Sequence, residues 1–177
     1  MNDGITTFAG LIIPSSDPIF LSVIALHIPL GVTAAVSGVL AMLSRKAHGR
    51  HPRFGTLYFW STAAIFVSAG ALSIMRWRED YHLFVLGALC FIAALVGRSA
   101  RRRRFPGWAR VHITAMGSSY VLLLTAFYVD NGKQLPLWRD LPVWSYWLLP
   151  AVIGVPLILR ALVSHPIARG PPDAGSR

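Results

Sequence analysis

The chain has 177 residues, of which 54% are hydrophobic and 14% are charged, and its mean hydropathy is +0.54. This composition is typical of an integral membrane protein and argues against a soluble helical protein, whose helices would carry polar outer faces. The formal net charge is +10, but the cations are divided among separate connecting segments, which argues against a nucleic-acid partner.

The N-terminal segment, residues 1–17, lacks the basic region that opens a signal peptide, and we expect it to form an interfacial lead-in. A helix should start at its end, because Asp17 can cap the helix and Pro18 suits the first helical position. Five apolar runs follow, each close to the roughly 20 residues that cross a hydrocarbon core. They span residues 18–43, 55–75, 81–97, 110–129 and 146–163.

These runs predict an all-α integral membrane protein with a bundle of five transmembrane helices in residues 18–164. Residues 165–177 are predicted to be a disordered tail. The connecting segments at one side of the bundle carry 13 Lys and Arg residues, and those at the other side carry 4. Because cytoplasmic segments hold the excess of cations, we expect the N-terminus outside and the C-terminus in the cytoplasm.

Histidines are the main ionisable residues that enter the predicted spans, since none of the five contains Asp or Glu. Ionisable groups in a bilayer are costly and are candidates for function. His27 and His82 lie toward the outer ends of their helices, and His51 and His112 lie near the inner ends. Each pair joins helix n to helix n+2, and two imidazoles facing each other in this way are the axial ligands of a b-type haem. We therefore predict one or two haem b groups.

Other residues are candidates for the surroundings of these haems. Small residues at Gly31 and Gly38 follow His27 on one helical face and would admit a flat ring. Candidate partners for haem propionates are the arginines near the inner and outer helix ends. They are Arg50, Arg53 and Arg110 at the inner end and Arg76 and Arg78 at the outer end.

Two features of the predicted helices work against these pairs. A third helix that begins at residue 81 leaves His82 several ångströms shallower than His27, and His51 precedes Pro52, outside the predicted second helix. The alternative is that the histidines hydrogen-bond a neighbouring backbone or headgroup. A further alternative is a zinc site formed by His48, His51 and His112, although no acid lies nearby to act as its general base.

Several short motifs resemble those of a known family. They are "ALHIPLG" in the first span, "HPRFG" after the basic loop, "YH" at the third span and "RVHITAMGSSYVLLLTAFYVDNG" in the fourth. Over residues 18–163 the chain resembles bacterial membrane proteins grouped as domain of unknown function 2306. The resemblance implies a multi-pass protein of the bacterial inner membrane. The pairing of helix n with helix n+2 is also similar to the four-helix core of the cytochrome b561 group, whose two haems lie near opposite faces.

Three functions follow from these predictions. The first is an oxidoreductase component that carries electrons across the membrane, with a quinol or another redox partner. The second is a cofactor-free subunit or assembly factor of a larger membrane complex, in which the histidines serve packing. The third is a small-molecule transporter, which the absence of carboxylates within the spans and of an inverted repeat argues against.

Overall fold

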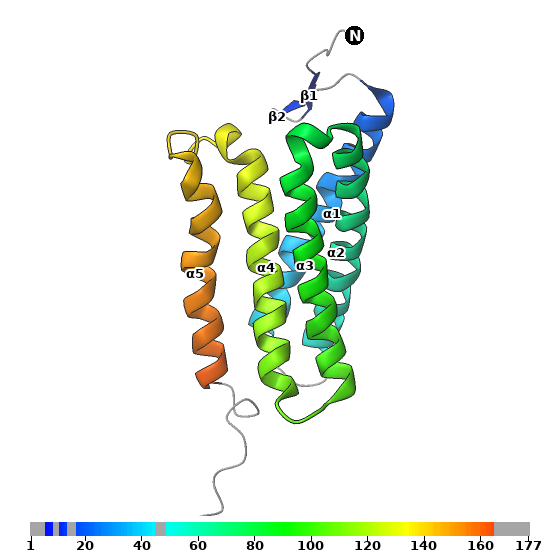
Figure 1. The fold of residues 1–177 in the computed structure, drawn as a ribbon. Helices are drawn as coiled ribbons and strands as arrows, with labels where there is room; N and C mark the ends of the chain where they lie inside the picture. Colours follow the sequence, from blue (N-terminus) through cyan, green and yellow to red (C-terminus); the bar gives the residue numbers. More distant parts are fainter. Residues whose placement is uncertain (1–5, 9–10, 14–16, 45–48, 165–177) are drawn as a thin grey trace, which may run out of the picture.

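The computed structural model describes residues 6–8, 11–13, 17–44 and 49–164, and five long helices make up most of it (Figure 1). The helices are α1 (Pro18–Leu43), α2 (Arg50–Met75), α3 (Trp77–Arg103), α4 (Trp108–Asn131) and α5 (Val143–Ser164). A 3-10 turn, η1 (Gly132–Gln134), extends α4, and the short antiparallel strands β1 (Thr6–Phe8) and β2 (Leu11–Ile13) precede α1. The predicted five-helix bundle is confirmed, whereas the β-hairpin within the lead-in segment was not predicted.

Two helices extend beyond the apolar runs that predicted them. α2 begins at Arg50 and so includes His51 and Pro52, because proline is tolerated in the first turn of a helix. α3 begins with an acidic first turn and ends with three arginines, Arg101–Arg103. Charges of these signs are favourable at the two ends of a helix dipole, so both ends of α3 continue past the hydrophobic segment.

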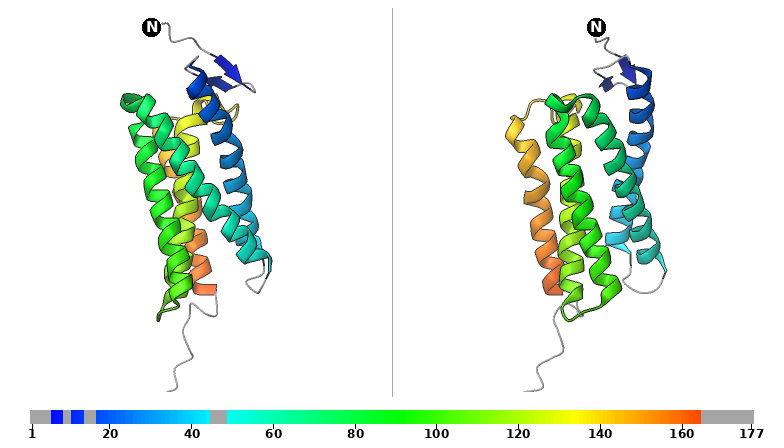
Figure 2. Two further views of the ribbon diagram at one scale, coloured as in Figure 1. Left: turned by 90° about the vertical axis from the view of Figure 1, so that its right-hand side faces the viewer. Right: turned by 45° about the vertical axis from the view of Figure 1, so that its right-hand side comes forward.

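Each helix runs antiparallel to the one before it. In Figure 1, α3, α4 and α5 lie in one row, α2 lies beside α3, and α1 passes behind the bundle. The two views of Figure 2 show α2 close to α3 at the end where α2 turns into α3 and diverging from it toward the opposite end. This opposite end, where α2 and α4 begin, carries most of the arginines and is called the basic end below.

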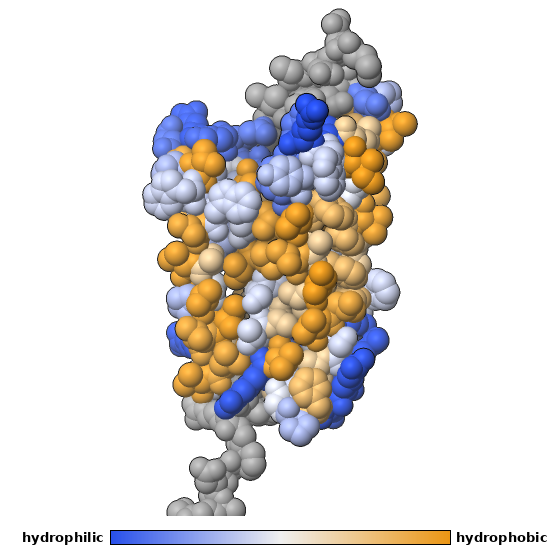
Figure 3. Space-filling view, in the orientation of Figure 1, coloured by the Kyte–Doolittle hydropathy of each residue, from blue (hydrophilic) through white to orange (hydrophobic). Residues whose placement is uncertain are grey.

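The surface of the bundle is suited to lipid. All five helices are long and apolar enough to cross a membrane. On the face that Figure 3 shows, hydrophobic residues cover the middle of the bundle and hydrophilic residues lie toward its two ends. Large apolar side chains such as Val67, Ile74 and Val152 are well exposed on this surface. The protein is therefore a multi-pass membrane protein whose helices contact the lipid bilayer.

The predicted orientation can be tested with single cysteines in a Cys90→Ser background, which preserves a small polar group inside the bundle. Asp140, between α4 and α5, and Arg102, near the end of α3, are both exposed and lie at opposite ends of the bundle. An Asp140→Cys variant should react with a membrane-impermeant maleimide in intact cells, whereas Arg102→Cys should react only after the membrane is opened. The reverse pattern would contradict the orientation predicted from the cations.

A polar group of side chains connects three helices inside the bundle. The buried Tyr58 hydroxyl of α2 lies 2.7 Å from the Ser119 hydroxyl of α4. Cys90 of α3 donates to the Ser119 carbonyl at 3.2 Å. Next to them, Tyr120 donates to the Ala35 carbonyl of α1 at 3.1 Å. These bonds satisfy polar groups that would otherwise be costly away from water.

We expect Tyr58→Phe to lower the free energy of unfolding by about 1 kcal/mol, because the substitution removes the hydroxyl that pairs with Ser119. Unfolding of the purified protein from mild detergent into a denaturing one measures the change. Tyr120→Phe is the matched control and should cost less, since the Tyr120 side chain is only partly buried. Equal stability of Tyr58→Phe and the wild type would contradict the expected contribution.

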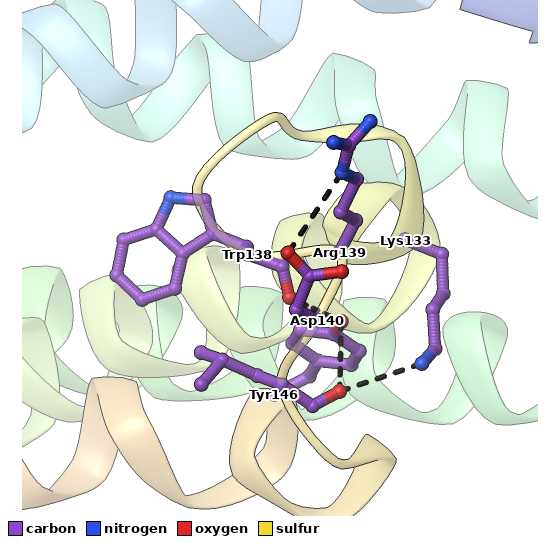
Figure 4. A network of polar contacts seen from close by, with 6 residues as sticks. Lys133, Trp138, Arg139, Asp140 and Tyr146 are labelled. Atoms are coloured by element: carbon purple, nitrogen blue, oxygen red, sulfur yellow. Dashed lines mark hydrogen bonds and ion pairs between the residues drawn. The ribbon is translucent and has the colours of Figure 1, made fainter.

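The connection between α4 and α5 is held by its own polar contacts, shown in Figure 4. The Tyr146 hydroxyl donates to the Trp138 carbonyl at 2.7 Å, and Lys133 donates to the Leu141 carbonyl at 3.4 Å. Gly132 faces the Tyr146 ring so closely that a β-carbon there would lie 2.6 Å from it. The start of α5 is therefore fixed against the end of α4.

Candidate functional site

His51 and His112 occupy corresponding positions at the basic end. His51 lies in the first turn of α2, and its Nδ1 is 2.8 Å from the Ala41 carbonyl of α1. His112 lies near the start of α4, and its Nδ1 is 2.8 Å from the Gly97 carbonyl of α3. A carbonyl can only accept, so both Nδ1 atoms carry the proton and donate it. In each neutral ring the lone pair is then on Nε2.

The two rings lie next to each other although they come from different helix pairs. Their centroids are 6.3 Å apart, and their planes are inclined by 79°. Two imidazoles that bind one metal ion from opposite sides, with metal–nitrogen bonds of about 2 Å, have ring centroids about 6 Å apart. The mutual inclination is unrestricted, because each ring can rotate about its own metal–nitrogen bond. The separation of the ring centroids is therefore close to that of two imidazoles on one metal ion.

The partners of the Nδ1 atoms also fit metal ligation. Histidines that bind a metal usually donate their other N–H group to a carbonyl or carboxylate, which fixes the ring and raises its basicity. The carbonyls of Ala41 and Gly97 are in this role for His51 and His112. Sequence analysis missed both carbonyls, because a backbone group has no signature of its own. The spacing of Ala93, Gly97 and Ala100 did offer a signal for close helix packing at this level.

Several cationic side chains are exposed near the helix ends that carry this inner pair. Arg50 and Arg53 are exposed in the first turn of α2, and Arg110 is exposed two residues before His112. All three lie at the same end of the bundle as the pair. Arg98 has a different role, since its guanidinium lies 4.6 Å from the centre of the Phe59 ring. The predicted inner propionate partners are therefore at the right end of the molecule for this role.

The outer histidines have separate surroundings. His27 Nδ1 lies 2.8 Å from the Ser68 hydroxyl, and this hydroxyl donates to the Ile65 carbonyl at 3.0 Å. Since a hydroxyl has one proton, Ser68 accepts from His27. The His82 ring contacts Tyr81 and, at 6.1 Å, Trp147 of α5. No ring contact joins His27 to His82 in the part of the chain that the structure describes, so the structure brings together the inner pair and not the outer one.

The depth of the outer pair explains part of this difference. Gly70 packs on Phe84 and Gly87 packs on Phe66, which sets the register of α2 against α3. In this register Ser68 of α2 lies at about the same depth in the bundle as residue 85 of α3. His27 lies at this depth too, because it contacts Ser68. His82 lies three positions nearer the outer end, or about 4.5 Å at 1.5 Å per residue. The early start of α3 at Trp77 therefore does not bring His82 to the depth of His27.

The remaining residues predicted to surround a haem are two arginines and two glycines, and the glycines differ in the space beside them. Arg76 lies between α2 and α3 and Arg78 lies in the first turn of α3, at the end opposite the basic end and on the same side as His82. A β-carbon at Gly31 would meet no atom within 4 Å, whereas one at Gly38 would lie 2.5 Å from the Tyr120 ring. The space beside Gly38 thus holds a side chain of the protein itself.

The predicted zinc site is only partly within the described structure, because His48 lies outside the described residues. Within those residues, no three His, Cys, Asp or Glu side chains gather in a way that could hold a metal ion. Comparison of the chain with protein-family models, with curated proteins and with solved structures finds no match. The resemblances to the domain of unknown function 2306 and to the cytochrome b561 group therefore stay predictions.

Proposed function

We propose that this membrane protein is an electron-transfer component that binds one b-type haem between His51 and His112. The observation that carries the proposal is the inner pair itself. Two rings from α2 and α4 lie 6.3 Å apart, and each is oriented by a backbone carbonyl bound to Nδ1. This arrangement supports His51 and His112 as the residues that would hold the haem through Nε2.

When bound, a haem with two axial imidazoles supplies reversible one-electron transfer without a binding position for substrate at the iron. The chain would hold the rings through the carbonyls of Ala41 and Gly97. Arg50 and Arg53 would neutralise the propionates at the basic end, where they can remain in contact with headgroups and water. An apolar carrier such as a quinol, or a soluble redox partner at this face, would exchange the electron.

The geometry supports one haem better than two. A second haem on His27 and His82 requires His82 to leave Trp147 and to move inward by about one helical turn. A single haem near one face would exchange electrons with partners at that face or within the bilayer. The full transmembrane path predicted from two stacked haems would then need another carrier.

An absorption spectrum of the purified protein, expressed with ample haem, tests the proposal. We expect a Soret band, sharp α and β bands on reduction, and a pyridine-haemochrome assay that gives about one haem b per chain. Protein that is folded by circular dichroism and shows no Soret band contradicts the proposal. A content of two haems per chain would instead support the outer pair as a second site.

The cofactor-free alternative has an observation of its own. Between the levels of the two histidine pairs, the bundle is filled by its own side chains, with Tyr58, Ser119 and Cys90 hydrogen-bonded and buried. A solid interior of this kind is compatible with a subunit that works without a cofactor. Co-purification with that complex, together with full function of a His51→Ala variant, would favour this alternative over electron transfer.

A further inference from the structure

A cavity of about 560 Å³ that is open to the surface lies between α4 and α5 at the basic end. Among the residues that the structure describes, its lining is formed by Arg110, Thr114, Leu162 and Val163. The volume is within the range of small-molecule sites, which is about 300–1,000 Å³. The lining combines one guanidinium and one hydroxyl from α4 with two aliphatic side chains from α5, so its two sides differ in polarity.

The packing of α5 explains why the cavity is at this end. Nearer the outer end, the two helices approach closely at glycines, because a β-carbon at Gly154 would lie 2.2 Å from Val121. One at Gly117 would lie 2.5 Å from Ile158. Closer to the basic end, the positions that face each other carry Arg110 and Thr114 instead of glycine. The cavity therefore lies beyond the close glycine contacts, toward the basic end.

The charge of this end of the bundle adds to the contribution of Arg110. Arg160 of α5 is exposed at the same end, together with the run of arginines that closes α3. Such a concentration of cations attracts anionic headgroups, with a contribution of about 1 kcal/mol for each cation near the surface. The helices that line the cavity cross the membrane, so lipid is the solvent of its aliphatic side.

We infer that this cavity binds an anionic phospholipid. The phosphate would contact the Arg110 guanidinium and the Thr114 hydroxyl, and one acyl chain would lie along Leu162 and Val163. Both parts of the ligand are needed, since free phosphate lacks the chain and a zwitterionic lipid lacks the net charge. The inference depends on the membrane-spanning fold and not on the haem.

Titration of the purified full chain in mild detergent tests this site. Phosphatidylglycerol should raise the midpoint of thermal unfolding in a saturable way, whereas phosphatidylcholine and inorganic phosphate should raise it much less. In Arg110→Gln the apparent affinity for phosphatidylglycerol should fall about fivefold or more, the equivalent of one cation. Arg102→Gln is the matched control, because it removes an exposed cation at the same end and outside the cavity.

A second variant separates the cavity from the charge. Leu162→Trp fills the aliphatic side while every cation is preserved, and it should also weaken phosphatidylglycerol binding. Equal effects of Arg102→Gln and Arg110→Gln, or unchanged binding in Leu162→Trp, would show general attraction to a basic surface and overturn the site. Equal shifts with phosphatidylcholine would overturn it as well. The Soret band reports on His51 and His112 independently, so failure of one proposal is distinguishable from failure of the other.

Discussion

Replacement of His112 by Ala is expected to lower haem affinity by more than tenfold and to remove most of the Soret band from the purified protein. The substitution removes one of the two proposed Nε2 ligands, and it also releases the Gly97 carbonyl that orients the ring. Loss of groups that only support a metal ligand typically costs 10–100-fold in affinity, and loss of the ligand itself should cost at least as much. His51→Ala should have the same effect. The haem content measured as pyridine haemochrome, per folded chain, gives the result.

Two controls keep this prediction specific. His82→Ala removes a histidine that contacts Trp147 instead of another histidine, and it should retain the haem. His112→Gln keeps a side-chain N–H donor near Gly97, so it should preserve the fold while it still removes the ligand. Full haem content in both His51→Ala and His112→Ala, with loss in His82→Ala, would assign the haem to the outer pair and contradict the inner site.

Replacement of Gly97 by Val is expected to destabilise the protein by about 1–3 kcal/mol, the usual cost of overpacking. A β-carbon at this position would lie 2.7 Å from Cγ of Met116 and 3.2 Å from its backbone nitrogen. The backbone cannot give way as the end of a side chain can, so α3 and α4 must separate. Unfolding in detergent mixtures measures the loss of stability, and the haem content of the remaining folded protein should fall too, since Gly97 also orients His112.

Gly55→Ala is the control for Gly97→Val. A β-carbon at Gly55 would meet no atom within 4 Å. Alanine is favoured over glycine inside a helix by about 1 kcal/mol. Gly55→Ala should therefore be neutral or stabilising. A Gly97→Val variant as stable as Gly55→Ala would show that α3 and α4 do not depend on close contact at this level.

The sequence was sufficient to predict the five helices, because long apolar runs have no other stable form in a bilayer. It predicted the helix ends less well. A hydropathy pattern ends at the first charged residues, but a helix can continue through them. The arginines at the end of α3 and the first turn of α2 are helical although they lie outside the apolar runs. The hairpin of β1 and β2 was missed because two three-residue strands have no periodicity that distinguishes them from a loop.

The candidate site, like the helix ends, was predicted only in part from the sequence. The depths of His51 and His112 follow from residue counts along the helices, and the structure brings the two rings together. The same counting paired His27 with His82, which the structure leaves apart. Depth alone cannot determine the direction of a side chain around its helix, and the direction of His82 toward α5 depends on how α4 and α5 pack.

The divergence of α2 from α3 in Figure 2 gives the inner pair a consequence for folding. His51 is at the start of α2 and His112 is near the start of α4, at the end of the bundle where α2 and α3 lie apart. A group that holds both rings would connect the α1–α2 and α3–α4 hairpins at the end opposite their covalent connection, and it would make the two hairpins unfold as one cooperative unit.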